Sequence, residues 1–233
     1  MVPRQTLERE ILRLQDELLT LGNRVSYAIV EAVDLLRRRD LVGAQRLIAE
    51  DRLVNQRRMV IEADCLALIA TQQPIAGDLR TIAAMLDIAT ELERINDYAK
   101  GIAKVTLMLG ERELLKPPPD LPHMAQLAQG MLHRALHAFA RRDVDLARAI
   151  PAGDDAVDTL YNQVYRELMT LMIANPATLD CANCLLWVAH NLERTADRVI
   201  NICERVVFTV TGEMVELDTE IESPPTYRNS QQG

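Results

Sequence analysis

The same acidic signature occurs twice in this chain, at positions that differ by one hundred. It reads Glu-Arg-Ile-Asn-Asp from Glu93 to Asp97 and Glu-Arg-Thr-Ala-Asp from Glu193 to Asp197. In each copy the two acids are four residues apart, and residues at that spacing lie on one face of a helix. The duplication therefore predicts two similar halves, each with a long helix that projects two carboxylates in the same direction.

Helical periodicity extends through most of the sequence. Apolar residues recur at spacings of three and four from Leu7 to Ala32, a pattern typical of an amphipathic helix. Aromatic residues make up only 3%, which also favours helices over sheets. A charged hinge interrupts the pattern near residue 40. Prolines interrupt it at residues 74, 117–119 and 176, because proline cannot continue a helix. These signals predict six helices, over about 7–39, 41–71, 75–110, 121–142, 144–174 and 177–211.

The two halves also match outside the acidic motifs. Phe139–Asp143 occupies the same hinge as Leu36–Asp40, and Asp51–Asn55 parallels Asp154–Asp158 with an offset of 103. We therefore expect an all-α fold, a tandem pair of antiparallel three-helix bundles. The expected repeats are residues 1–116 and 117–212. Residues 213–233, acidic and then polar, are expected to form a disordered tail.

Composition excludes several classes of protein. A net charge of -8 disfavours a general nucleic-acid binder and direct binding to an anionic membrane. No secretory signal and no apolar stretch long enough to cross a membrane is visible. The four cysteines include a single CxxC, which we interpret as buried thiols in a reducing compartment. We expect a cytoplasmic protein that has no nucleic-acid partner.

The acidic motifs are candidate metal ligands. Two neighbouring carboxylates repel each other unless a cation, an arginine or a proton relieves them. Oxygen ligands suit magnesium, calcium or manganese, and carboxylate clusters also hold iron. An alternative is an exposed acidic face neutralised by Arg94 and Arg194, without metal. The predicted ligands are Glu93, Asp97, Glu193, Asp197 and, one turn further on, Asn201; weaker candidates are Asp51, Glu62, Asp87 and Asp158.

Sequence motifs of catalysis are scarce. A di-iron enzyme of the ferritin type uses Glu-x-x-His on two helices, whereas His190 and Glu193 stand in the reverse order and have no counterpart near Glu93. Neither a phosphate-binding P-loop nor a GxSxG nucleophile motif occurs. We predict a protein that is not an enzyme. Two alternatives remain: a metal-dependent enzyme with an activated water, and a structural adaptor whose acidic faces pair with basic helices of a partner.

The sequence resembles the PhoU family of accessory regulators of bacterial phosphate uptake and signalling. The resemblance covers about residues 7 to 213, and the paired acidic motif in a tandem repeat is its most specific part. The family motif usually reads ERIGD, so Asn96 and the Thr195-Ala196 pair are departures that bear on packing and on the number of metal ions bound. The stretches that match are 48–51, 54–55, 73–80, 92–97, 139–143, 192–198, 201–204 and 210–213.

The resemblance implies a fold of two three-helix bundles and a regulatory role. Some family members bind multinuclear metal clusters, which places divalent or trivalent ions (iron, zinc, manganese or magnesium) on Glu93, Asp97, Glu193 and Asp197 here. It implies docking on the ATPase subunit of a phosphate ABC transporter and on a sensor histidine kinase. The protein would be a negative regulator of phosphate-starvation signalling, a homodimer, and peripheral to the membrane through its partners only.

Overall fold

The computed structural model describes residues 3–110 and 115–217, and within these ranges the regular structure is entirely helical. The first half contains α1 (Pro3–Arg38), α2 (Leu41–Gln72) and α3 (Gly77–Leu109). The second half contains α4 (Asp120–Arg141), α5 (Val144–Ala149), α6 (Asp154–Ala174) and α7 (Leu179–Thr211). Two short 3-10 turns, Pro151–Gly153 and Pro176–Thr178, precede α6 and α7.

The expected helix over 144–174 is the main point at which the structure differs from the sequence prediction. It is divided into α5 and α6 by the 3-10 turn that begins at Pro151. Proline has no N–H to donate and its ring crowds the preceding turn, so the α-helical hydrogen bonding stops there. The other five helices are found within a few residues of their predicted limits.

The duplication is visible in the backbone as well as in the sequence. Arg39 and Arg142 end α1 and α4 with φ of 55° and 54°, the left-handed conformation that commonly terminates helices. The next residue caps the following helix in both halves: Asp40 Oδ1 accepts from Gly43 N at 2.8 Å, and Asp143 Oδ1 accepts from Leu146 N at 2.9 Å. Each half is thus the same helical unit, built with the same hinge.

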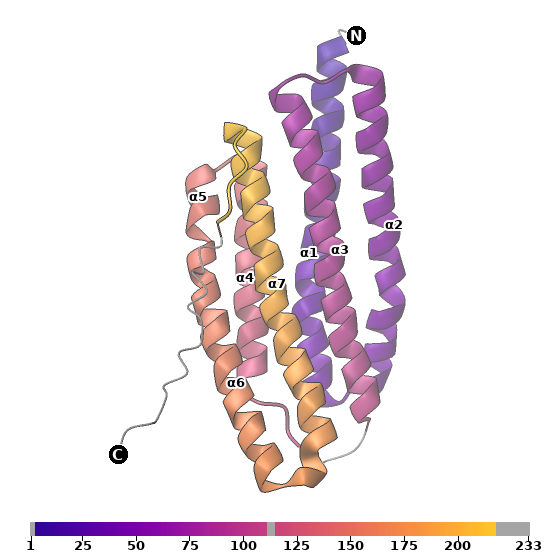
Figure 1. Cartoon of the computed structure of the whole chain (residues 1–233). Coiled ribbons are helices and arrows are strands. Elements are labelled where there is room, and N and C mark those ends of the chain that lie inside the picture. Colours follow the sequence, from indigo (N-terminus) through magenta and orange to yellow (C-terminus); the bar gives the residue numbers. More distant parts are fainter. Residues whose placement is uncertain (1–2, 111–114, 218–233) are drawn as a thin grey trace, which may run out of the picture.

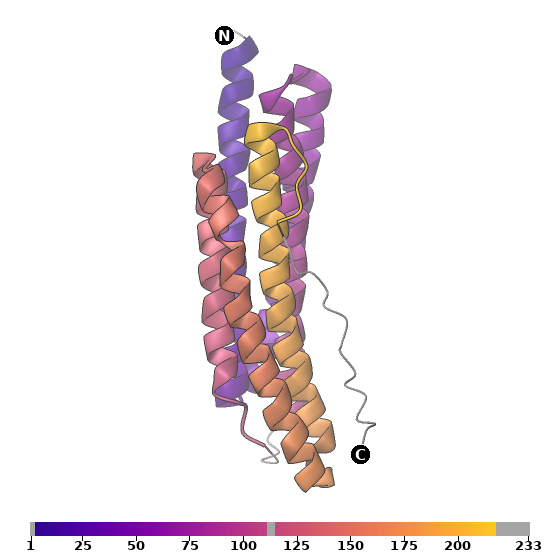
Figure 2. The ribbon, with the colours of Figure 1, turned by 60° about the vertical axis from the view of Figure 1, so that its left-hand side comes forward.

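The two bundles lie side by side, with their long helices along a common direction (Figures 1 and 2). They pack through α3 against α7 and through α1 against α4. Leu18, Leu92, Leu132 and Val199, which come from these four helices, are buried in one continuous apolar cluster. The expected tandem pair of three-helix bundles is confirmed, and its two halves share a core. The limit between repeats at 116 and 117 stays a prediction.

The expected disordered tail is described only in its first residues. Residues 213–217 are not helical and run back along α7, where Val215 and Leu217 pack against the core. Leu217 N donates a hydrogen bond to Glu204 Oε1 at 3.0 Å. Residues 218–233 lie outside the described part of the chain. Among the described helices, none combines the length and apolar character needed to span a membrane.

Candidate functional site

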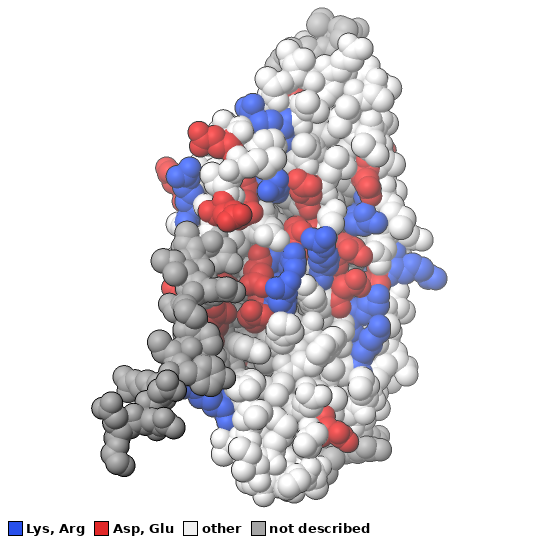
Figure 3. All heavy atoms as spheres, in the orientation of Figure 1, with Lys and Arg blue, Asp and Glu red and all other residues white. Residues whose placement is uncertain are grey.

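The two helices that contain the acidic motifs cross in opposite directions at the centre of the molecule. Asp87 and Glu91 of α3 lie beside Arg205 and Asn201 of α7, with distances of 3.5 Å and 3.3 Å between their polar atoms. Further along α3, Gly101 lies against Trp187, which is near the start of α7. The motifs therefore lie mid-length in both helices. Figure 3 shows acidic and basic side chains gathered in a band across the middle of this face.

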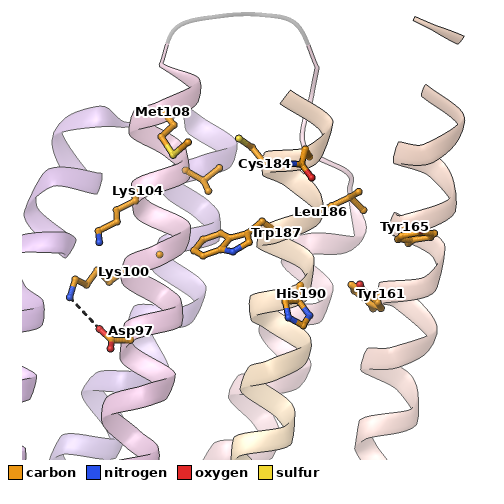
Figure 4. Close-up of a pocket in the computed structure, with 13 residues that line it drawn as sticks. Asp97, Lys100, Lys104, Met108, Tyr161, Tyr165, Cys184, Leu186, Trp187 and His190 are labelled. Carbon is orange, nitrogen blue, oxygen red and sulfur yellow. Dashed lines mark hydrogen bonds and ion pairs between the residues drawn. The ribbon is translucent and has the colours of Figure 1, made fainter. Parts of the chain in front are cut away.

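In the first repeat the motif faces Asp51, a buried carboxylate of α2 that is 7% exposed. Asn96 Nδ2 donates to Asp51 Oδ1 at 2.9 Å, while Lys100 Nζ and Asn55 Nδ2 donate to Oδ2 at 2.6 Å and 3.1 Å. Lys100 also reaches Asp97 Oδ1 at 3.2 Å (Figure 4). The first cluster is consequently a mixed one, in which a lysine ammonium bridges carboxylates of α2 and α3.

Glu93 lies partly buried in the same cluster. Burial raises the pKa of its carboxyl group, the negative charge of Asp97 raises it further, and the guanidinium of Arg58 on α2 opposes the shift. Arg58 in turn donates to Glu62 at 2.7 Å. Glu93 and Asp97 therefore lie close enough to repel each other, as their spacing on the helix predicts.

In the second repeat, Glu193 and Asp197 lie partly buried on α7. His190 Nδ1 is 3.2 Å from Glu193 Oε2, and Arg194 Nη1 is 3.1 Å from Asp197 Oδ2. The carboxylate of Glu193 also acts on Tyr161 of α6, whose pKa is raised first by burial and then by this charge. The second cluster is thus formed between α6 and α7, as the first is formed between α2 and α3.

A third polar cluster, absent from the sequence prediction, joins the two repeats. Glu91 of α3 is buried, and its carboxylate accepts from Arg94 Nη1 at 2.6 Å and from Asn201 Nδ2 at 3.3 Å. Arg198 Nη1 of α7 lies 3.6 Å from the same carboxylate. Asn201, a predicted metal ligand, is thus placed against Glu91, and its role as a ligand stays a prediction. The sequence contained one signal for this cluster: Glu91, two positions before Glu93, is an acid on the apolar face of α3.

The donor sets of the two repeats differ in how well they suit a metal ion. Over residues 3–110 and 115–217, no three His, Cys, Asp or Glu side chains converge in an arrangement that could hold one. In the sequence, the second repeat has carboxylates at four positions whose first-repeat counterparts are three carboxylates and the amide of Asn55. Carboxylate oxygens are ligands that magnesium, manganese and iron accept. The four second-repeat carboxylates are those of Asp154, Asp158, Glu193 and Asp197. In the first repeat, the lysine already occupies the space between Asp51 and Asp97.

A groove of about 890 Å³ opens between α3, α6 and α7, beside the motifs. Figure 4 shows Trp187 pointing from α7 towards α3, with Tyr161 and Tyr165 on α6 and Met108 near the end of α3. Trp187 is 46% exposed and Met108 is 69% exposed. A Cβ on Gly101 would lie 2.5 Å from Trp187 Cη2, so the glycine leaves the space that the indole occupies. Large apolar side chains held open to solvent in a groove are typical of a docking surface.

Comparison with known proteins agrees with this architecture. The family model of the PhoU domain matches twice, over residues 18–106 and 121–206. A phosphate-specific transport system accessory protein PhoU homolog of Caulobacter vibrioides (strain NA1000 / CB15N) is 36% identical over 205 residues, which are 88% of this chain and 89% of the relative. A homolog of the same name from Streptococcus pneumoniae serotype 4 is 33% identical over 92% of this chain and 100% of the relative.

Solved structures give the same result. The crystal structure of the phosphate transport system regulatory protein PhoU from Streptococcus pneumoniae aligns with a TM-score of 0.84 and 32% identity, over 90% of this chain and 99% of that one. PhoU from Pseudomonas aeruginosa aligns with a TM-score of 0.83 and 33% identity, over 88% and 99% of the two chains. Two matched repeats, whole-length relatives and a shared fold show that this chain belongs to the PhoU family.

Proposed function

We propose that this chain is a non-enzymatic regulator of phosphate uptake that holds phosphate-starvation signalling off when phosphate is abundant. It would act by docking on the ATPase subunit of a phosphate ABC transporter and on a sensor histidine kinase, as a homodimer in the cytoplasm. The observation that supports the proposal is membership of the PhoU family, whose relatives are named as accessory proteins of phosphate-specific transport.

The groove beside the motifs supports docking as the mode of action. Trp187 and Met108 present apolar area to solvent next to the amines of Lys100 and Lys104, which line the same groove. A partner segment with apolar anchors and acidic flanks matches this combination of surfaces. The proposal places the transporter or kinase contact here.

The proposal also includes a metal ion in the second repeat. Glu193 and Asp197 would provide ligands from α7, and Asp154 and Asp158 would provide them from α6. Bound there, an ion would supply positive charge between the two helices and join them. The argument for these ligands is the chemistry of the donor set, because each of the two neighbouring helices has two carboxylates four residues apart.

The first experiment measures alkaline phosphatase in phosphate-rich medium, in the native host with the gene deleted and then restored. The proposal predicts high output in the deletion and low output after restoration. Restoration with Trp187→Ala is expected to leave output high, although the purified variant keeps its helical circular dichroism. Leu12→Ala, which removes an exposed leucine of α1 outside the groove, is the matched control and is expected to restore repression.

Two results would contradict the proposal at different levels. Low output in the deletion strain would remove the proposed role in phosphate signalling. Full repression by the Trp187→Ala variant would leave that role in place and exclude the groove as the contact. Light scattering of the purified protein, which gives its mass in solution, tests the expected homodimer separately.

A further inference from the structure

The chain turns back along α7 after that helix ends at Thr211. Arg205 Nη1 lies 3.4 Å from Met214 Sδ, and Leu217 N donates to Glu204 Oε1 at 3.0 Å. Figure 1 shows residues 213–217 running beside α7, away from the end of the helix. At Leu217 the chain is therefore next to Glu204 and is directed towards the start of α7, where the groove lies.

A continuous surface path joins Glu204 to the groove. Residues at spacings of three and four lie on one face of a helix, and in the stripe of α7 that runs from Glu204 to Trp187 none is buried. The two ends of the stripe are 17 positions apart, which is about 25 Å along the helix axis. The residues of the stripe are Glu204, Asn201, Asp197, Arg194, His190 and Trp187.

The sequence that follows Leu217 is long enough to cover this path. An extended chain advances about 3.3 Å per residue, so about eight residues cover the distance. The eighth residue after Leu217 is Pro225, which follows another proline and precedes Tyr227 by two positions. An extended run along the stripe would therefore bring this apolar segment to the groove and lay the acidic segment 218–222 over the middle of α7.

The acidic segment 218–222, which reads Asp-Thr-Glu-Ile-Glu, meets positive charge on this path. Arg94 of α3 is 50% exposed and Arg194 of α7 is 38% exposed. The two motif aspartates beside them already pair with Lys100 and Arg194. At the groove, Lys104 is exposed and makes no ion pair within residues 3–110 and 115–217 (Figure 4). The charges of the segment and of the path are thus complementary.

The apolar segment suits the groove that it would reach. Proline-rich segments dock in grooves lined by aromatic side chains, because their extended backbone is already formed before binding. Trp187 is 46% exposed and Tyr165 is 44% exposed, and both line the groove, from α7 and α6. An acidic flank followed by apolar anchors is also the combination that the groove favours in a partner protein.

We infer that the ligand of the groove in the isolated protein is the chain's own segment 218–227, with its acids along α7 and its two prolines against Trp187. The segment is tethered at Leu217, so its concentration near the groove is of the order of a millimolar and weak contacts suffice to hold it. A partner that docks in the groove must displace the segment, a consequence that rests on the docking role proposed above. The inference departs from the expectation that residues 213–233 form a disordered tail.

The test uses the fluorescence of Trp187, the only tryptophan in the chain. Acrylamide quenching is measured on the purified full-length protein. Pro224→Ser/Pro225→Ser, which changes no charge, is expected to raise the quenching constant at least two-fold over wild type, because the indole loses its cover. The matched control, Gln231→Ala/Gln232→Ala, changes two residues beyond the segment and should leave the constant as in wild type.

A second variant tests the charges. Asp218→Asn/Glu220→Gln/Glu222→Gln is expected to raise the quenching constant at least two-fold. Sodium chloride at about 0.5 M should raise the constant of wild type and leave that of this variant unchanged, because salt screens the attraction between exposed charges. Cys184 lines the same groove, so its rate of modification by a thiol reagent should also rise at least two-fold in the proline variant.

Wild-type quenching in either variant would overturn the inference. Measurements at protein concentrations ten-fold apart should agree, and protection that grows with concentration would overturn a contact within one chain. None of these readouts involves a partner or phosphate. Low alkaline phosphatase output in the deletion strain would therefore remove the proposed function without touching the contact, whereas unprotected Trp187 would remove the contact and leave the proposed function in place.

Discussion

Replacing Glu91 by glutamine tests how strongly the polar cluster between the repeats stabilises the fold. Glu91 is 8% exposed, and its two oxygens face Arg94, Arg198 and Asn201. A hydrogen bond between charged groups contributes about 1.5–3 kcal/mol net. Arg94 is 50% exposed, so its share must be reduced for solvent screening. Glutamine keeps one acceptor oxygen and loses the charge.

We expect Glu91→Gln to lower the free energy of unfolding by about 2 kcal/mol. For a chain of this size, that corresponds to a melting temperature lower by about 4–8 °C. Urea unfolding followed by circular dichroism measures the free energy, and a thermal scan measures the shift. The matched control is Asp87→Asn, the same change of charge one turn earlier on α3.

Asp87 is 56% exposed and lies 3.5 Å from Arg205, so its pair with that arginine is solvated. The control should therefore change the free energy of unfolding by no more than about 0.5 kcal/mol. Equal effects of the two substitutions would refute the reasoning, because burial would then not distinguish the two ion pairs. A Glu91→Gln variant more stable than wild type would show instead that the cost of removing the carboxylate from water exceeds its attraction to the arginines.

Three further predictions follow from single contacts. Burial and the charge of Asp97 raise the pKa of Glu93 in the folded state, so its destabilising effect exists above that pKa and is lost as the pH falls through it. Glu93→Gln should therefore melt higher than wild type at pH 7, with a difference that shrinks in acid; a constant difference across the pH range would contradict this. Burial raises the pKa of Cys203 to about 12, whereas Cys184 lines the open groove. A thiol reagent at neutral pH should modify Cys184 in the native protein and Cys203 only in denaturant, as peptide mass mapping can check. Ser26 is fully buried with its Oγ 2.6 Å from the Nε2 of a histidine on α4, so Ser26→Ala should cost about 1 kcal/mol in urea unfolding, and no change would exclude that bond as a stabilising one.

Local signals were sufficient to predict five of the six expected helices. The apolar spacing and the prolines at positions 74, 117 and 176 indicate breaks between helices, and the structure has a break at each of them. Pro151 was visible in the sequence too, but the apolar pattern continues on both sides of it, and the helix prediction therefore extended through the break. The duplication was predictable because both hinges keep the aspartate that caps the next helix, Asp40 and Asp143.

The composition of the clusters was less accessible to sequence analysis. Glu93 and Asp97 share a helix face, and their spacing alone brings them together. The contact of Lys100 with Asp51 depends on the register of α3 against α2, two helices whose contact residues are 49 positions apart. The contact of Asn201 with Glu91 depends on the crossing of α3 and α7, across 110 positions. Periodicity gives the face of each helix, but it does not give the register between helices.

The antiparallel contact of α3 with α7 and of α1 with α4 joins each helix to its own counterpart. That is the arrangement of a symmetric dimer, in which the same surface is used on both subunits. Here a single chain provides both surfaces, so a change in one half is not copied into the other. An ancestral pair of identical subunits would have had to accept or reject a lysine in both clusters at once. Covalent fusion removes that constraint, so the first cluster can contain Lys100 between its carboxylates while the second has Ile200 at the same position.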